Sequence, residues 1–280
     1  MPLKLLTEDH YRGSRKGSVV SDGVSAHTHI ALLDINDSGS PERCYVKLYP
    51  DSVSGVEHRG IVNEIVGHVL AAAMGAPVPK NAGLIALNSS QLSNLPSWIS
   101  PDAACAGWWV QDVASPSLRA YYRLSDLSQA ADVIQRKLSS ARRELLATDQ
   151  IHLVIALDDL IANIDRNIGN LLRIKKGEYV LIDHGMCLTS DFWVSTDLDA
   201  DLEYDNCLAD LLDPDSSFLP FKHKTVMAHE NLVKNIEPAI QSLLKWLPYA
   251  VDMAESSAIE TFIRGRAKPG SLVSRKGLFA

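Results

Sequence analysis

Residues 158–185 read DDLIANIDRNIGNLLRIKKGEYVLIDHG. Apolar residues at spacings of three and four lead into this stretch and open it, which predicts the end of a helix. A polar loop follows around 165–170. The apolar runs at 171–174 and 179–182, separated by Lys-Lys-Gly, predict a β-hairpin. The second strand ends on an acid, in the triplet Asp183-His184-Gly185.

The spacing of the polar residues in this stretch fits phosphoryl transfer. That chemistry needs a carboxylate to take the proton of the acceptor, and an amide oxygen with a second carboxylate to hold Mg²⁺ on the phosphates. Asp165 and Asn170 are five positions apart, and Asp183 follows across the hairpin. One Asp–Asn pair alone would more often be an ordinary turn. Two polar clusters joined by a hairpin favour a catalytic site.

Protein kinases carry these residue types in the same order, as Asp, Asn and the Asp of a D-F-G triplet. The stretch resembles the catalytic segment of HipA-like kinases, and the D-R-x-x-x-N and I-D-[FH]-G signatures of phosphatidylinositol 3-/4-kinases. The resemblance covers residues 20–190. It implies an α+β, bilobal protein-kinase-like fold, with a small antiparallel β-sheet and one helix in the N-lobe and a mainly helical C-lobe. It implies bound ATP and Mg²⁺, and a protein Ser or Thr as acceptor. It also implies Asp165 as base or acceptor-orienting carboxylate, with Asn170 and Asp183 as Mg²⁺ ligands.

Two charged residues in the N-terminal half extend the resemblance. The alternating run at 44–49 predicts a strand that carries Lys47, and the periodicity at 61–74 predicts a helix with Glu64 near its start. Taken alone, both side chains would more often face solvent. Y-V-K-L, N-E-I-V and G-A-P-V-P resemble the strand lysine and the following helix of HipA-like kinases. This implies that Lys47 binds the ATP phosphates and that Glu64 orients Lys47.

The loop that would cover the phosphates has the weakest pattern. Neither G-x-G-x-x-G nor a Walker sequence occurs, which excludes a P-loop of that type. The run at 23–27 resembles the short G-x-[ST]-x-P segment of HipA-like proteins, with His in place of Pro. This implies that Gly23 and Ser25 bring backbone amides close to phosphate oxygens. The run at 13–17 is an alternative, and a plain turn fits either run.

Between the two halves, the runs at 82–95 and 105–114 predict a second pair of strands. Gln111 and Val113 then fall where a kinase passes from its N-lobe into the hinge, so we assign them to the adenine site by position. Neighbouring Trp108 and Trp109 are more typical of a core than of a ligand platform.

The composition of the chain argues against several other classes of function. The chain has 280 residues, 46% hydrophobic and 22% charged, as in an ordinary soluble globular protein. A formal charge of −7 argues against a general nucleic-acid binder, and no apolar run is long enough to span a membrane. The four cysteines lie far apart with no C-x-x-C pair, which favours free thiols in a reducing cytoplasm over a disulfide frame or a zinc knuckle.

The predicted organisation is an N-lobe over 1–113, a helical C-lobe over 114–264 with two amphipathic helices over 226–262, and a mobile tail over 265–280 that is rich in Gly and basic residues. The acidic run at 191–215 is either a solvated surface or a docking surface for a basic protein substrate. HipA relatives are often toxins paired with a DNA-binding antitoxin, which implies an antitoxin-like partner. The chain is shorter than full HipA and shows no counterpart of its extra N-terminal subdomain, which weighs against that role.

Two other classes remain open. A lipid or small-molecule kinase would keep the same catalytic residues, although the acidic run disfavours a membrane-facing surface. A pseudokinase would bind partners without turnover. The presence of Lys47, Glu64, Asp165, Asn170 and Asp183 argues against that class.

Overall fold

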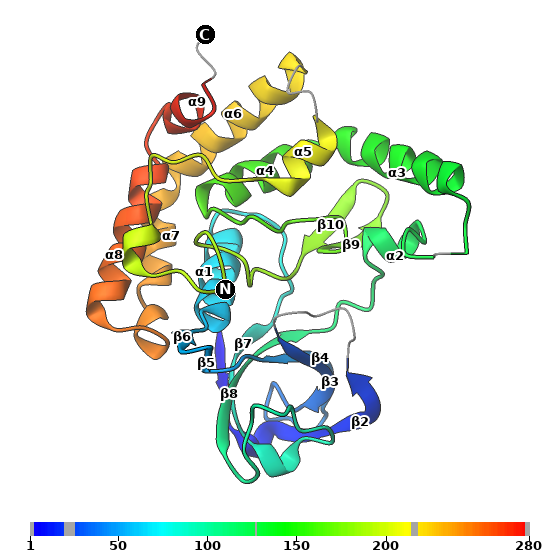
Figure 1. The fold of residues 1–280 in the computed structure, drawn as a ribbon, viewed down its shortest axis with the longest axis vertical. Coiled ribbons are helices and arrows are strands. Elements are labelled where there is room, and N and C mark those ends of the chain that lie inside the picture. Colours follow the sequence, from blue (N-terminus) through cyan, green and yellow to red (C-terminus); the bar gives the residue numbers. More distant parts are fainter. Residues whose placement is uncertain (1–2, 20–25, 127, 214–217, 278–280) are drawn as a thin grey trace.

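The computed structural model describes residues 3–19, 26–126, 128–213 and 218–277. They form two lobes, one a curled β-sheet and the other mainly helical (Figure 1). This is the bilobal α+β architecture that the sequence predicts. Gly23 and Ser25, the residues expected over the phosphates, lie outside the described residues.

The sheet of the N-lobe has six strands in the order β1-β7-β8-β4-β3-β2. Neighbouring strands run antiparallel, except that β1 pairs with β7 in parallel. The expected antiparallel sheet therefore has a parallel edge that the sequence did not predict. The strands are β1 (Lys4–Leu6), β2 (Tyr11–Val19), β3 (His27–Leu33), β4 (Glu42–Leu48), β7 (Ala82–Asn88) and β8 (Ala104–Gln111), and a separate small hairpin joins β5 (Ser52–Val53) to β6 (Val56–Glu57).

Alternation along the strands sends side chains into two environments. Val46 and Leu48 of β4 are fully buried inside the curled sheet, whereas Lys47 between them points to the other face and lines the cleft between the lobes. The tryptophans of β8 divide in the same way. Trp109 lies in the interior of the sheet, and Trp108 packs edge-on against a histidine of helix α1. Both rings are buried, as expected for core residues.

Helix α1 (Gly60–Ala73) lies between the sheet and the helical lobe, where it packs on α7 (Ile236–Leu243) (Figure 1). The predicted helix is confirmed to within one residue at each end. It stops at Gly75, whose φ of 81° is the left-handed conformation that glycine adopts readily. A Cβ on Gly67 would lie 2.3 Å from the Cβ of His184, so only glycine lets the helix approach this segment so closely.

The helical lobe follows the hinge and carries the remaining hairpin at its surface. Helix α4 packs on α6, and α2 contacts β9. The sequence predicts two helices over 226–262, whereas the structure has parts of three there. The elements are α2 (Leu118–Tyr121), α3 (Ala131–Leu146), α4 (Gln150–Leu160), β9 (Leu171–Lys175), β10 (Glu178–Leu181), α5 (Cys207–Leu212), α6 (Leu219–Lys234), α7, α8 (Met253–Arg266) and α9 (Ser271–Arg275).

Across the described ranges, none of these helices combines the length and the apolar character needed to cross a bilayer.

The C-terminal segment differs from the mobile tail that we expected over 265–280. As far as residue 277 it packs on the lobe, and Leu272 of α9 is buried. Arg266 is fully buried and donates from Nε to the backbone oxygen of Asp159 at 2.9 Å, while Arg275 forms an ion pair with the Asp159 carboxylate. Two of the basic residues that suggested a tail, Arg266 and Arg275, therefore neutralise the buried carboxylate of Asp159.

Candidate active site

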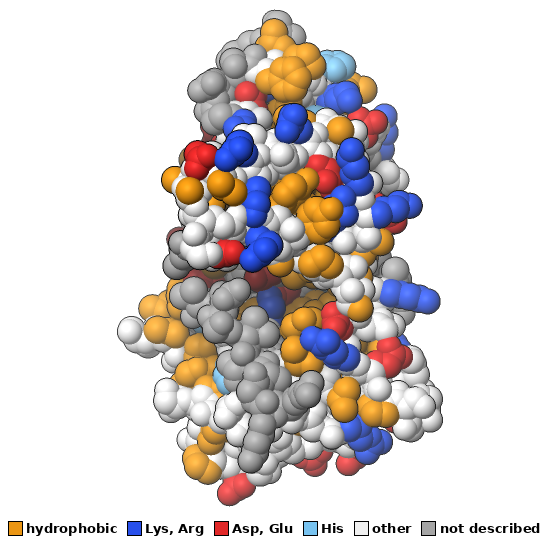
Figure 2. All heavy atoms as spheres, turned by 90° about the vertical axis from the view of Figure 1, so that its right-hand side faces the viewer, with side chains coloured by type: hydrophobic (Ala, Val, Ile, Leu, Met, Phe, Trp, Pro, Cys, Tyr) orange, Lys and Arg blue, Asp and Glu red, His pale blue; other side chains and the backbone are white. Residues whose placement is uncertain are grey.

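A cleft of about 440 Å³ separates the two lobes. Figure 2 looks onto its mouth, which crosses the molecule at mid-height. Seven of the nine site residues predicted from the sequence line this cleft, and the other two lie outside the described residues. The seven are Lys47, Glu64, Gln111, Val113, Asp165, Asn170 and Asp183.

Lys47 joins two carboxylates at the back of the cleft. Its Nζ lies 2.5 Å from Oε1 of Glu64 and 2.6 Å from Oδ1 of Asp183. Burial acts to lower the pKa of Lys47, but the charges of Asp183 and Glu64 raise it well above its ordinary value. Glu64 is held in place by two further donors, the hydroxyl of Tyr49 at 3.2 Å and the backbone N–H of His184 at 3.1 Å. The structure thus brings together three groups from a strand, a helix and a distant loop.

Asp165 and Asn170 belong to one loop, whose conformation is fixed by its own side chains. The amide of Asn170 donates from Nδ2 to the backbone oxygen of Asp165 at 3.2 Å. Oδ1 of Asn167 accepts from the N–H of Gly169 at 2.8 Å, closing a tight turn. Partial desolvation, and then the negative charge of Asp183, raise the pKa of Asp165 above that of an ordinary aspartate.

Arg166 is a site residue to which the sequence analysis gave no role. Its side chain is fully buried, and its Nε lies 3.2 Å from both carboxylate oxygens of Asp158. Its Nη1 donates to the backbone oxygens of Ile182 and Asp183, and its Nη2 to Nδ1 of His184 at 2.9 Å. Burial, and then the charge of Arg166, hold the pKa of His184 well below its ordinary value, so the neutral ring accepts this bond. One guanidinium therefore ties the loop of Asp165 and Asn170 to the Asp183 loop.

The backbone of Asp183 is left-handed, with φ of 63°. Such a conformation is costly for a residue other than glycine, and at functional sites the surrounding contacts hold it in place. Here Nη1 of Arg166 donates to the carbonyl oxygen of Ile182, the residue before Asp183, and to that of Asp183 itself. Burial acts to raise the pKa of Asp183, and the Lys47 ammonium lowers it below its ordinary value. The carboxylate is therefore ionised and aimed at the cleft.

Asn63, one turn before Gly67 on α1, is a second residue whose part the sequence did not reveal. It is completely buried. Its Nδ2 donates to the backbone oxygens of Gly185 at 2.7 Å and Ser190 at 2.8 Å, and its Oδ1 accepts from Nε1 of Trp193 at 2.8 Å. All its hydrogen-bonding groups are thus used to fix the loop after Asp183 against α1.

The hinge side of the cleft suits a flat, apolar ligand. The side chain of Gln111 is occupied, since it accepts from Asn81 at 2.8 Å and donates to Glu42, so this amide braces the hinge. Within the described ranges, the backbone of Val113 makes no hydrogen bond. Its N–H and C=O are therefore available to a nucleobase. The apolar side chains that line the cleft are Tyr45, Trp108, Val110, Leu172, Leu181 and Ile182.

The side-chain oxygens of Asn170 and Asp183 fit a Mg²⁺ site. Asn170 uses its Nδ2 within the loop, and no described residue donates to its Oδ1. The side chain of Asp183 is 46% exposed. Among the described residues, no group of three or more His, Cys, Asp or Glu could hold a metal ion. Two oxygen ligands suit a cation that takes its remaining ligands from water and phosphates, as Mg²⁺ does.

Comparison with known proteins identifies the fold but no family. A scan against models of protein families finds no match, and neither does a search of curated proteins. Among solved structures, the chain is similar to the proinflammatory kinase CtkA of Helicobacter pylori, with a TM-score of 0.57 and 13% sequence identity. The likeness covers 99% of this chain and 97% of CtkA. At that identity it shows the fold alone, and the chain has a kinase-like α+β fold.

Proposed function

We propose that the protein is a kinase that depends on ATP and Mg²⁺ and transfers the γ-phosphoryl group to a Ser or Thr of a protein. The observation that carries the proposal is the position of Lys47, between Glu64 and Asp183 in the cleft that also contains Asp165 and Asn170. A structural role alone would not require a lysine, three carboxylates and an amide to converge on one open cleft.

The residues then divide the work of transfer. Lys47, oriented by Glu64, binds phosphate oxygens in place of its present contact with Asp183. Asn170 and Asp183 would hold Mg²⁺, which neutralises charge on the phosphates when bound. Asp165 accepts the proton of the acceptor hydroxyl, as the phosphoryl group passes from the β-phosphate oxygen of ATP to the acceptor oxygen. Its raised pKa improves it as a proton acceptor.

The remaining contacts follow from the cleft and from the resemblance to HipA-like kinases. The backbone around Gln111 and Val113 is proposed to bind adenine. The assignment of Gly23 and Ser25 to the phosphates rests on the resemblance alone, since both lie outside the described residues. All four cysteines are free, which supports a reducing compartment such as the cytoplasm. An antitoxin-like partner and autophosphorylation remain hypotheses that rest on the resemblance to HipA-like kinases.

Incubation with γ-labelled ATP and a lysate, followed by mapping of phosphosites, tests the proposal. The expected result is label on Ser or Thr of protein, lost with EDTA and lost in Asp165→Asn. If the wild-type protein neither binds ATP nor transfers label under any divalent cation, the proposal is wrong. Label recovered in lipid extracts alone would favour the lipid-kinase alternative.

A further inference from the structure

The surface on the hinge side of the cleft carries a charge opposite to that of the whole chain. Residues 118–146 and 171–178 contain nine Lys and Arg and four Asp and Glu, in a protein of net charge −7. They form α2, α3 and the β9–β10 hairpin, and we call them the basic surface. Figure 2 shows Lys and Arg side chains gathered on the upper half of this side of the molecule, above the cleft.

Much of this positive charge is not neutralised internally. Arg123, Arg136 and Lys175 form exposed ion pairs with acids three or four residues away. Among the described residues, five further cations of the basic surface have no carboxylate within ion-pair distance. These are Arg119, Lys137, Arg142, Arg143 and Lys176.

Arg119 connects the basic surface to the catalytic loop. It lies on α2, is exposed, and lines the cleft together with Asp165. Its backbone N–H donates to the oxygen of Ile168 at 3.2 Å, and its Nη2 donates to Oδ1 of Asn167 at 2.8 Å. The guanidinium therefore stands beside the residue proposed to deprotonate the acceptor, where the flanking residues of a bound substrate would pass.

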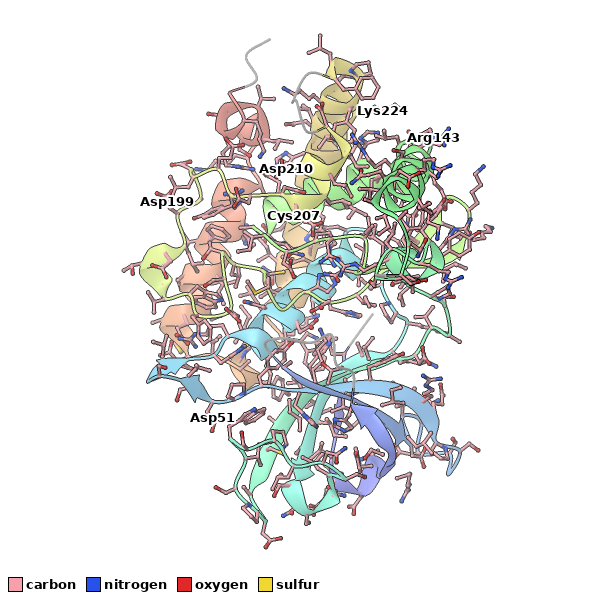
Figure 3. All side chains as sticks on the ribbon, turned by 45° about the vertical axis from the view of Figure 1, so that its right-hand side comes forward. Asp51, Arg143, Asp199, Cys207, Asp210 and Lys224 are labelled. Atoms are coloured by element: carbon pink, nitrogen blue, oxygen red, sulfur yellow. The ribbon has the colours of Figure 1, made fainter. Side chains whose placement is uncertain are left out.

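The acidic run offers less to a basic substrate than its composition suggests. Oδ2 of Asp197 accepts from the N–H of Val194 at 3.0 Å, and Oδ1 of Asp199 accepts from the N–H of Asp201 at 2.9 Å. Glu203 likewise pairs with a lysine of the C-terminal segment. Figure 3 shows Asp199 and Arg143 on opposite sides of the helical lobe, so the part of the acidic run around Asp199 lies away from the basic surface. The later part of the run, which forms α5, contacts α3.

We propose that the phosphate acceptor is a Ser or Thr within an acidic protein segment, which binds along the basic surface with one carboxylate on Arg119. This rests on the kinase activity proposed above and specifies its substrate class. Each exposed ion pair contributes little by itself. Several aligned cations raise the local concentration of an anionic partner and speed its encounter, and added salt screens the effect.

Three Ser peptides of equal length, flanked by Glu, Ala or Lys, test this against γ-labelled ATP. The wild-type protein should favour the Glu peptide over the Lys peptide by roughly tenfold or more in kcat/KM, with the preference shrinking as salt rises. Arg119→Glu should lower kcat/KM for the Glu peptide and raise it for the Lys peptide, whereas Arg119→Lys should keep the acidic preference. Lys245→Glu is the matched control, because Lys245 is exposed just after α7, across the molecule from α2.

The outcomes separate this inference from the kinase proposal. Equal use of the three peptides, or preference for the Lys peptide, overturns the acidic-acceptor inference while the kinase proposal stands. Transfer to vesicles of phosphatidylinositol in phosphatidylcholine, with no peptide labelled, also overturns it in favour of a lipid acceptor. Absence of both ATP binding and all transfer overturns the kinase proposal itself. Misfolding would lower kcat/KM for both charged peptides. It cannot explain a variant, Arg119→Glu, that lowers kcat/KM for the Glu peptide and raises it for the Lys peptide.

Discussion

The ammonium of Lys47 lies 2.5 Å from Oε1 of Glu64, although the two residues are 17 positions apart on a strand and a helix. Nothing local forces this contact, because a loop and the β5–β6 hairpin separate the two elements. The same ammonium also reaches Asp183, 136 positions away in the other lobe. This geometry leads to the first prediction.

Lys47→Met should reduce transfer strongly, because it removes the only one of these three groups whose positive charge can stabilise the phosphates. The expected loss is roughly 10²- to 10³-fold in kcat, similar to that for removal of one charge-stabilising donor elsewhere. Glu64→Gln should slow transfer less, since Glu64 acts only through Lys47. Single-turnover transfer of labelled phosphate measures both. Equal losses in the two variants would contradict the division of roles.

Asp165→Asn should lower the transfer rate by about 10²- to 10⁴-fold while ATP still binds, because the amide keeps its size but cannot accept a proton. The wild-type rate should fall as pH drops through the pKa of Asp165, which desolvation and Asp183 place above that of an ordinary aspartate. The residual rate of Asp165→Asn should lack this acid limb. A pH–rate profile of both proteins decides the point, and an unchanged limb in the variant would assign it to another group.

Asp183→Asn should weaken nucleotide binding only when divalent cation is present, because the carboxylate is proposed to bind the metal and not the nucleotide directly. Calorimetric titration with ATP, with Mg²⁺ and then with EDTA, measures the difference. The wild-type protein should bind ATP more tightly with Mg²⁺. If EDTA leaves its affinity unchanged, Asn170 and Asp183 are not the metal ligands.

Arg166→Met should destabilise the fold by about 3–5 kcal/mol, because it leaves the buried carboxylate of Asp158 without its cation, with only the amide of Asn163 still donating to it. Denaturant unfolding followed by fluorescence measures the loss. Arg136→Met is the matched control, since Arg136 pairs with Asp132 on the surface of α3 and its side chain is 73% exposed. Its cost should stay near or below about 0.5 kcal/mol. Similar costs in the two variants would show that the Asp158–Arg166 pair is not specifically stabilising.

Gly67→Ala should lower activity beyond its effect on stability, because the added Cβ would push His184 and the Asp183 loop away from α1. Overpacking of this kind costs about 1–3 kcal/mol. Gly265→Ala on α8 controls for the packing effect, since its Cβ would lie 2.5 Å from the Cβ of Ala200 and neither residue lines the cleft. Rates corrected for the folded fraction should fall only in Gly67→Ala. A rate in Gly67→Ala equal to that of the control would remove the link between α1 and the loop.

The sequence predicted those parts of the molecule that local pattern controls. The polar loop and hairpin after α4, the alternation around Lys47 and the periodicity of α1 are all readable within short windows. The three residues of β1 are too few to show a period, so its parallel pairing with β7 was not foreseen.

The burial of charged side chains cannot be predicted from short sequence windows. Arg166 reads as a loop residue, and arginines in loops are usually exposed. Its burial depends on Asp158 below it and on the carbonyls of the Asp183 loop. The packing of α9 depends in the same way on Asp159, 116 positions from Arg275. Such contacts exist only after the chain has folded, and composition suggested a mobile tail instead.

The polar contacts of Asn63 and Arg59 connect helix α1 to the helical lobe, although the sequence of α1 belongs to the N-lobe. Asn63 bonds to Gly185, Ser190 and Trp193, and Arg59 pairs with Glu255 of α8. Helix α1 is thus joined to the helical lobe by polar contacts, although its sequence lies among the strands. If the sheet moved relative to α1 and the helical lobe together, the pivot would lie between β4 and α1. Opening the cleft and separating Lys47 from Glu64 would then be the same movement.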